Sequence, residues 1–370
     1  MHKVNMSSFQ LYVLLFITMN GTGLLTAPGL LARMAGASSW MAPFLAMPVG
    51  LVAIWLAVKL NRQFPEDNLV GIAEKVAGPV AGRALSLLYL FYMLSSTGFV
   101  LRQFSDFLTN SFLMRTPGTV VSACLLLVGG YAVKQGPELL GRLGTMFLPI
   151  FISLSLLVCL PMLWNAHIRY ALPLGSAGWE SVLSGAYALQ LWFPMMTFAS
   201  FYLPYVGDKR KALAGGIWMV VVNTIWFACT NLFALVVLGP AASGFNYPIM
   251  TIVRQVQLSE FVEHIDALVM MGWVLAFFVR IVVCLFGAAV GTARWLGLPN
   301  YRPLVYPLAW LLVIVSQWGL RNTQYIPNST GALCMFYLAN AIALPSVLLL
   351  LSLLRRVNDR SGETTPAGPS

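Results

Sequence analysis

A run of small and polar residues interrupts the apolar stretch LLFITMNGTGLLTAPGLLAR (14–33), and it consists of Asn20, Gly21, Thr22 and Gly23. A helix broken here would free backbone N–H and C=O groups, and glycine lets a ligand approach them closely. A half-helix beginning near Gly23 would also direct its positive end toward an anion. The pattern predicts either a ligand site at a broken helix or, equally, glycines that let a neighbouring helix pack closely.

A second candidate is Arg280, in the middle of the apolar stretch 262–291. A charge inside a membrane is costly, so it normally faces the bundle interior and has a partner. No Asp or Glu lies at comparable depth in another predicted span, which favours a ligand or a water cavity over a structural ion pair. Trp273, Phe277 and Cys284 share its helical face. This face would line a pocket in which the guanidinium meets an anionic ligand group.

A second interruption occurs in the stretch 182–205, which has Pro194 at its middle. Proline removes one backbone hydrogen bond and exposes a carbonyl. If the spans form two halves of five, this sixth span corresponds to the first. Paired breaks in corresponding spans indicate an inverted-repeat transporter with a site at the midplane. Hydroxyls of Tyr89, Tyr92 and Ser96 share one face of the third span, although aromatic packing is the expected role of at least one tyrosine.

Residue patterns that support catalysis or metal binding are missing from the sequence. There is no HExxH motif, no P-loop and no nucleophile elbow, and the five cysteines lack CxxC spacing. Glu263 and Asp266 share a helical face, but they are expected to orient a helix end or to accept from Arg254 or His264. We therefore expect no enzyme, no cofactor and no metal site.

The elements that hold these residues are predicted to be membrane helices. Of the 370 residues 59% are hydrophobic and 9% charged, which excludes a soluble globular domain. Apolar runs of about 20 residues, the length that crosses a bilayer core, predict about ten spans. They lie near 9–33, 39–60, 84–111, 117–133, 143–163, 182–205, 212–239, 262–291, 303–320 and 331–354.

The net charge of +10 is spread singly between the spans, which argues for topology signals and against nucleic acid binding. With the N-terminus inside, 15 Lys and Arg residues fall on the cytoplasmic side and 6 outside. Both termini are thus predicted to be cytoplasmic. The polar segment 357–370 is expected to be a disordered tail, and residues 1–356 a single membrane domain of two repeats, about 9–163 and 182–354. Short amphipathic helices are expected at 69–76 and 249–256, the second as a lid or, more commonly, an interfacial helix.

Three motifs resemble the spore germination receptor B-subunit family of the amino acid, polyamine and organocation transporter superfamily. They are NGTGLLTAP, LPLGSAGW and YPIMTIVRQVQLSEFVEHIDALVMMGWVLAFFVR. The resemblance implies an all-α polytopic membrane protein with a LeuT-like five-plus-five inverted repeat and broken helices 1 and 6. It also implies the spore inner membrane, contact with membrane lipid, and recognition of a small-molecule germinant, often an amino acid. A receptor A subunit and a C lipoprotein subunit would be its partners, and binding would trigger germination.

Carried over by position, the resemblance places the germinant pocket at Gly21, Thr22, Gly23, Tyr92, Pro194 to Thr197, Arg280 and Cys284. Relatives tend to have a small or polar residue where this chain has Arg280, which suggests a more anionic germinant or a chloride-like ion. Many have an acidic residue in span six, where this chain has Thr197 and Phe198. His264 stands where an arginine is usual, which would weaken an ion pair there.

A proton- or sodium-coupled amino acid transporter is the alternative function. Symport needs a titratable or ion-coordinating group near the site, and no carboxylate or histidine lies deep in the predicted spans. This favours a receptor, in which a ligand shifts an equilibrium between two conformations. Backbone carbonyls and water could still serve an ion.

Overall fold

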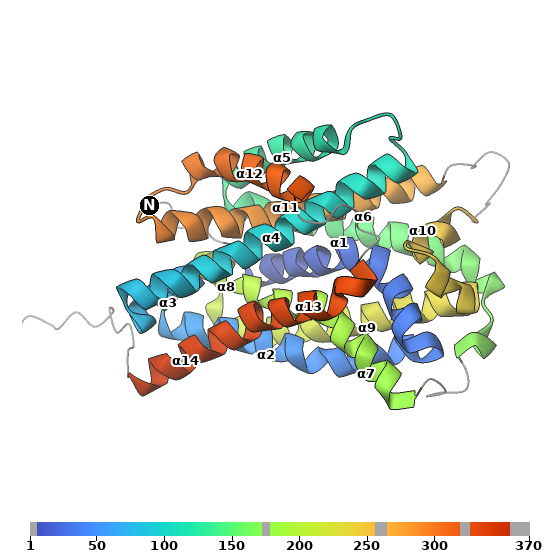
Figure 1. Ribbon diagram of the computed structural model, residues 1–370, viewed down its shortest axis with the longest axis horizontal. Coiled ribbons are helices and arrows are strands. Elements are labelled where there is room, and N and C mark those ends of the chain that lie inside the picture. Colours follow the sequence, from blue (N-terminus) through green and yellow to red (C-terminus); the bar gives the residue numbers. More distant parts are fainter. Residues whose placement is uncertain (1–5, 172–177, 256–264, 319–325, 356–370) are drawn as a thin grey trace, which may run out of the picture.

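The computed structural model describes residues 6–171, 178–255, 265–318 and 326–355, and nearly all of them are helical. The longer helices are α1 (Ser8–Ala35), α2 (Ala42–Gln63), α4 (Pro79–Ser111), α5 (Gly118–Gln135), α6 (Pro137–Met162), α9 (Ala212–Leu238), α11 (Ile265–Trp295) and α12 (Val305–Trp318). The shorter ones are α3 (Leu69–Ala77), α7 (Gly178–Ala188), α8 (Ala199–Tyr202), α10 (Pro248–Val253), α13 (Ile326–Leu338) and α14 (Leu344–Leu354). The long helices run along the long axis of the molecule, with α1 among them in the interior (Figure 1).

The lengths and apolar compositions of the helices confirm a polytopic membrane protein. Seven stretches of the described chain are long and apolar enough to cross a membrane. The first of them, Ser8–Gln63, contains both α1 and α2. The total of about ten spans stays a prediction, as do the boundaries of the two repeats. The predicted tail at 357–370 lies outside the described residues, and so do Glu263 and His264.

The predicted break in the first span is wrong, because α1 runs as one helix from Ser8 to Ala35. Its small residues serve helix packing instead. A Cβ at Gly21 would lie 2.8 Å from the carbonyl oxygen of Ala276 on α11, and one at Gly23 would overlap the ring of Phe227 on α9. Asn20 donates from Nδ2 to the Oδ1 of Asn223 on α9 at 2.8 Å. Close helix packing, the alternative to a broken helix that the sequence left open, therefore explains Asn20, Gly21 and Gly23.

We expect Gly21→Ala to destabilise the protein by roughly 1–2 kcal/mol, because the methyl group meets backbone that can move only with α11. Gly331→Ala on α13 is the matched control, since a Cβ there meets nothing within 4 Å. Thermal unfolding of both variants in detergent measures the difference. Equal midpoints for the two variants would contradict the packing role of Gly21.

The second break, at Pro194, is confirmed by the structure. Helix α7 ends at Ala188, and short 3-10 segments that include Phe193–Phe198 carry the chain to α8. Thr197 donates from Oγ1 to the carbonyl of Ala341 at 3.1 Å. Ala341 belongs to a π-helical turn, Ala339–Ala343, which joins α13 to α14. The broken segment is therefore fixed to an irregular turn on the helix it packs against.

Contacts close the end of the bundle at which α1 begins, the end predicted to be cytoplasmic. The backbone N–H of Ser8 donates to Oδ1 of Asp208 at 2.6 Å, and the hydroxyl of Tyr12 donates to the carbonyl of Ala212 at 2.5 Å. Asp67, only 7% exposed, pairs with Lys75 at 2.6 Å and with Arg294 at 3.0 Å. These bonds join α1, the α2–α3 connection and the end of α11 to their neighbours.

The two short amphipathic helices differ in how far the structure follows the prediction. Helix α3 spans Leu69–Ala77, so the helix predicted at 69–76 is confirmed, and the side chain of Asn68 accepts from the N–H of Gly71 at its start. At the opposite end of the bundle, α10 spans Pro248–Val253 and is shorter than predicted. Residue 256 lies outside the described residues.

Candidate functional site

A cavity of about 560 Å³ enters the bundle from the end opposite the closed one. Its lining extends along α1 from Thr22 to Arg33, which corresponds to about 16 Å of helix. Helices α4, α10, α11 and α13 and the segment around Trp192 complete the wall. With the predicted orientation, the cavity opens to the outside and ends near the middle of the membrane.

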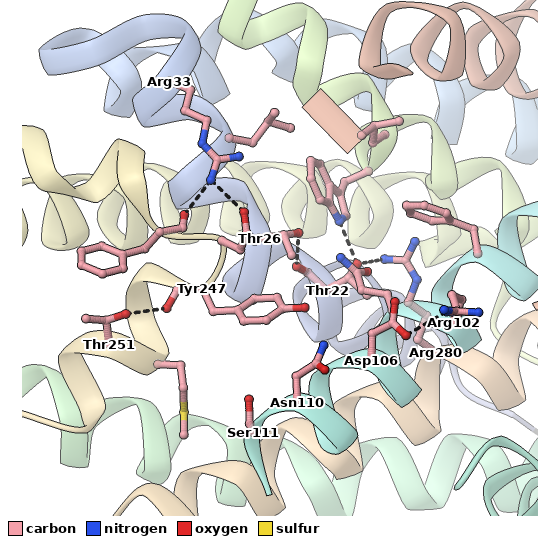
Figure 2. Close-up of a pocket in the computed structure, with 18 of the residues that line it drawn as sticks. Thr22, Thr26, Arg33, Arg102, Asp106, Asn110, Ser111, Tyr247, Thr251 and Arg280 are labelled. Carbon is pink, nitrogen blue, oxygen red and sulfur yellow. Dashed lines mark hydrogen bonds and ion pairs between the residues drawn. The ribbon is translucent and has the colours of Figure 1, made fainter. Parts of the chain in front are cut away.

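Arg280 and Thr22 form the deep end of the cavity (Figure 2). Arg280 is 3% exposed. Its Nη1 donates to the hydroxyl of Thr22 and to the carbonyl of Thr18, the latter at 3.3 Å. The indole Nε1 of Trp192 donates to the same Thr22 hydroxyl at 2.9 Å. One hydroxyl thus accepts from two buried donors and joins α1 to α11 and to the broken segment.

The charge of Arg280 is not balanced by a carboxylate within the described part of the chain. All of its hydrogen-bond acceptors there are neutral oxygens, and no ion pair of these residues includes it. Its buried Nε has no hydrogen-bond partner among them. A buried cation of this kind is costly unless a counter-charge reaches it.

Further arginines surround the outer part of the cavity. Arg33 donates to the carbonyls of Ser243 and Phe245 at 2.7 and 3.1 Å, and to Oδ1 of Asn246 at 2.8 Å. Figure 2 shows this guanidinium at the far end of the cavity from Arg280. All three acceptors are neutral, so none of them offsets the positive charge of Arg33.

Among the described residues, the lining contains a single carboxylate, Asp106, which pairs with Arg102 at 2.8 Å. Arg102 also donates to Oε1 of Gln317 at 3.1 Å. Arg254 is another lining cation. Four arginines against one aspartate give the described part of the lining a net positive charge.

Two of the predicted site residues, Thr22 and Arg280, line this cavity together. Gly21 and Gly23 face neighbouring helices instead. Pro194 and Thr197 are buried beside the π-helical turn and are not part of the lining.

Tyr92, Phe277 and Cys284 are also buried outside the lining. Tyr92 lies behind the cavity wall, with its ring centroid 5.1 Å from that of Tyr337. Tyr337 does line the cavity, and its hydroxyl donates to Ser96 at 2.8 Å. Tyr92 and Ser96 therefore support a wall residue rather than form the wall.

Sequence reasoning missed most of the outer lining and two residues of the deep end, Trp192 and Tyr337. A signal existed for Trp192, which stands two residues before the proline of the broken span. A signal also existed for Arg102 and Asp106, whose four-residue spacing places them on one helical face. Nothing in the sequence distinguishes Tyr337 from the other aromatic residues of the apolar spans.

The family model for spore germination proteins matches residues 5–323 of this chain. The chain is 25% identical to spore germination protein KB of Bacillus subtilis (strain 168) over 324 residues, which cover 85% of each chain. It is 22% identical to the putative spore germination protein YfkT of the same organism over 331 residues, 89% of this chain and 91% of the relative.

Two solved structures show the fold. The structure of MhsT in complex with L-phenylalanine matches with a TM-score of 0.64 at 13% identity, over 95% of this chain and 99% of that one. A mutant form of the manganese transporter of Eremococcus coleocola matches with a TM-score of 0.61 at 12% identity, over 97% and 82%. The family match establishes that this chain belongs to the spore germination protein family, and the two structures show that it has a LeuT-like fold.

Proposed function

We propose that this protein is the germinant-sensing membrane subunit of a spore nutrient receptor and that it binds a small nutrient in the cavity ending at Arg280. The cavity itself carries this proposal. It is open at one end, closed at the other, and ends at a buried cation that lacks a counter-charge among the described residues. Its volume lies in the range typical of small-molecule sites. The resemblance to the B-subunit family leads us to expect an amino acid or a similar nutrient.

The proposal also covers the membrane in which the protein lies and the subunits that it contacts. The relatives include spore germination proteins KB, B2 and A2 of Bacillus subtilis, which supports a role in a receptor complex. We place the protein in the spore inner membrane, with both termini cytoplasmic, beside a receptor A subunit and a C lipoprotein subunit. Ligand binding would change the balance between two conformations of the bundle and pass the signal to these partners.

A coupled amino acid transporter is the second candidate, and one observation favours it. A cavity open on one side with a closed opposite end is one half of an alternating-access cycle. Against it, no carboxylate of the described residues lies beside Arg280 to serve a proton or a sodium ion.

Germination of spores whose only nutrient receptor contains this subunit tests the proposal. We expect a nutrient to trigger germination in a scan of amino acids, organic acids, nucleosides and sugars. Arg280→Thr should abolish or change the response at an unchanged protein level. Arg210→Gln, an exposed residue at the closed end, is the control and should respond as the wild type does. An unchanged response in Arg280→Thr would place the site elsewhere, and robust uptake of a labelled nutrient by the lone subunit in vesicles would favour the transporter.

A further inference from the structure

We infer that the cavity selects a small organic carboxylate without an ammonium group, and that Arg280 binds the acid group. This inference rests on the proposed function, because it names the ligand class of the same cavity. It departs from the amino acid expected from the resemblance.

The first step is the unused hydrogen-bonding capacity of Arg280. Nη1 serves Thr18 and Thr22, whereas Nε and Nη2 form no hydrogen bond with the described residues. A guanidinium binds a carboxylate more strongly than it binds neutral oxygens, because the bonds are charge-assisted and the fork matches the two oxygens. A carboxylate at the deep end would supply the counter-charge that the described part of the protein does not provide there.

The second step concerns the ammonium group of an amino acid. Since α1 is continuous, most carbonyls around Gly21 accept from N–H groups inside the helix, and that of Thr18 accepts from Arg280 as well. The carbonyl of Leu24 lacks its helical donor because Pro28 has no N–H, but Leu24 is not part of the cavity lining. The carbonyl of Thr22 also accepts from Thr26 at 2.9 Å. Asp106, the one carboxylate among the described lining residues, is already paired with Arg102. An ammonium beside Arg280 would therefore meet a like charge and no available carboxylate of this lining.

The third step concerns the size and the wall of the cavity. A volume of about 560 Å³ is far larger than a halide ion needs. Apolar side chains of Phe99, Leu191, Trp192 and Leu333 lie in the lining together with the polar groups. They suit the carbon skeleton of an organic acid. The arginines nearer the opening, Arg33 and Arg254 among them, raise the local concentration of anions.

Binding of two matched ligand series to the purified full-length protein in lipid nanodiscs tests the inference. The first series has three carbons and comprises sodium propionate, L-alanine, L-alaninamide and propionamide. The second pairs 3-phenylpropionate with L-phenylalanine, and sodium chloride at equal ionic strength is the control. We expect at least one acid to bind ten times or more tighter than its matching amino acid, with no binding of the two amides.

The results that would overturn the inference are distinct from those that would overturn the proposed function. Amino acids that bind as tightly as the matching acids overturn the ligand class and leave the receptor proposal standing. Binding of chloride alone, or of neither series, also overturns it. Spores that respond to no nutrient at all, although the subunit is present, overturn the proposed function itself.

Variants of Arg280 connect the preference to this residue. Arg280→Gln should weaken binding of the acid tenfold or more and remove the preference over the amino acid. Arg280→Lys keeps the charge without the fork and should retain part of the affinity. Arg210→Gln should behave as the wild type. The wild-type series decides the ligand class even if Arg280→Gln does not fold, and an unchanged preference in a folded Arg280→Gln protein would exclude the assigned role.

Discussion

Replacing Thr22 by valine is expected to destabilise the protein by about 3 kcal/mol and to weaken ligand binding roughly a hundredfold. Valine has nearly the same shape as threonine but no acceptor. The Thr22 hydroxyl accepts from the indole of Trp192 at 2.9 Å and from Arg280. Both donors are buried, and a buried donor without an acceptor costs about 1–3 kcal/mol, more when it is charged. Among its bonds to the described residues, Arg280 would keep only the one of 3.3 Å to Thr18, and it would lose its fixed position.

Thr22→Ser is the matched control, because it keeps the hydroxyl and removes one methyl group. We expect it to retain most of the stability and binding. Chemical unfolding in detergent measures the first quantity, and ligand titration in nanodiscs measures the second. If the valine and serine variants behaved alike, the hydroxyl would have no role in holding Arg280.

Replacing Asp67 by alanine is expected to open the closed end of the bundle. The carboxylate is buried and pairs with Lys75 and Arg294, at the connection between α2 and α3 and at the end of α11. Removing one partner of a buried pair costs about 3–5 kcal/mol, but both cations are partly exposed, so about 2 kcal/mol is expected here. This shifts an equilibrium between closed and open forms by more than a factor of about 10.

The shift can be measured with Ser200→Cys in a background without native cysteines. Ser200 lies on α8, is 2% exposed, and its hydroxyl has no hydrogen-bond partner among the described residues. A membrane-impermeant maleimide applied from the side of the closed end should label it at least ten times faster when Asp67 is alanine. Glu138→Ala is the control, because Glu138 pairs with Arg142 on the surface and both are well exposed. Equal labelling rates in all variants would show that Asp67 does not hold the end closed.

The residues that the sequence singled out most clearly are those that are unusual in an apolar span. Arg280 and Pro194 are conspicuous because a charge or a proline inside a membrane helix requires a compensating partner. The structure gives Arg280 a place in the cavity wall and Pro194 a place in the broken segment. Hydropathy likewise predicted the membrane class, since length and apolar content alone determine it.

Whether α1 is broken or continuous could not be predicted, because the same pair of glycines is compatible with both structures. Gly21 and Gly23 would suit a broken helix as well as close contact with a neighbour. The deciding groups are Ala276 and Phe227, which come more than 200 residues later in the chain. The role of Tyr337 could not be predicted for the same reason, because it becomes a lining residue only when α13 lies beside the cavity.

An unbroken α1 connects the two ends of the bundle. Its 28 residues form a rod about 42 Å long. Its N-terminal end is bonded through Ser8 to Asp208, and its C-terminal end through Arg33 to the loop around Ser243. A tilt of about 10° around the middle would move the two ends by roughly 4 Å in opposite directions, as in shear motions of packed helices. Narrowing the opening of the cavity around a ligand would thus pull on the contacts that close the opposite end of the bundle, to the extent that the helix does not bend at Pro28.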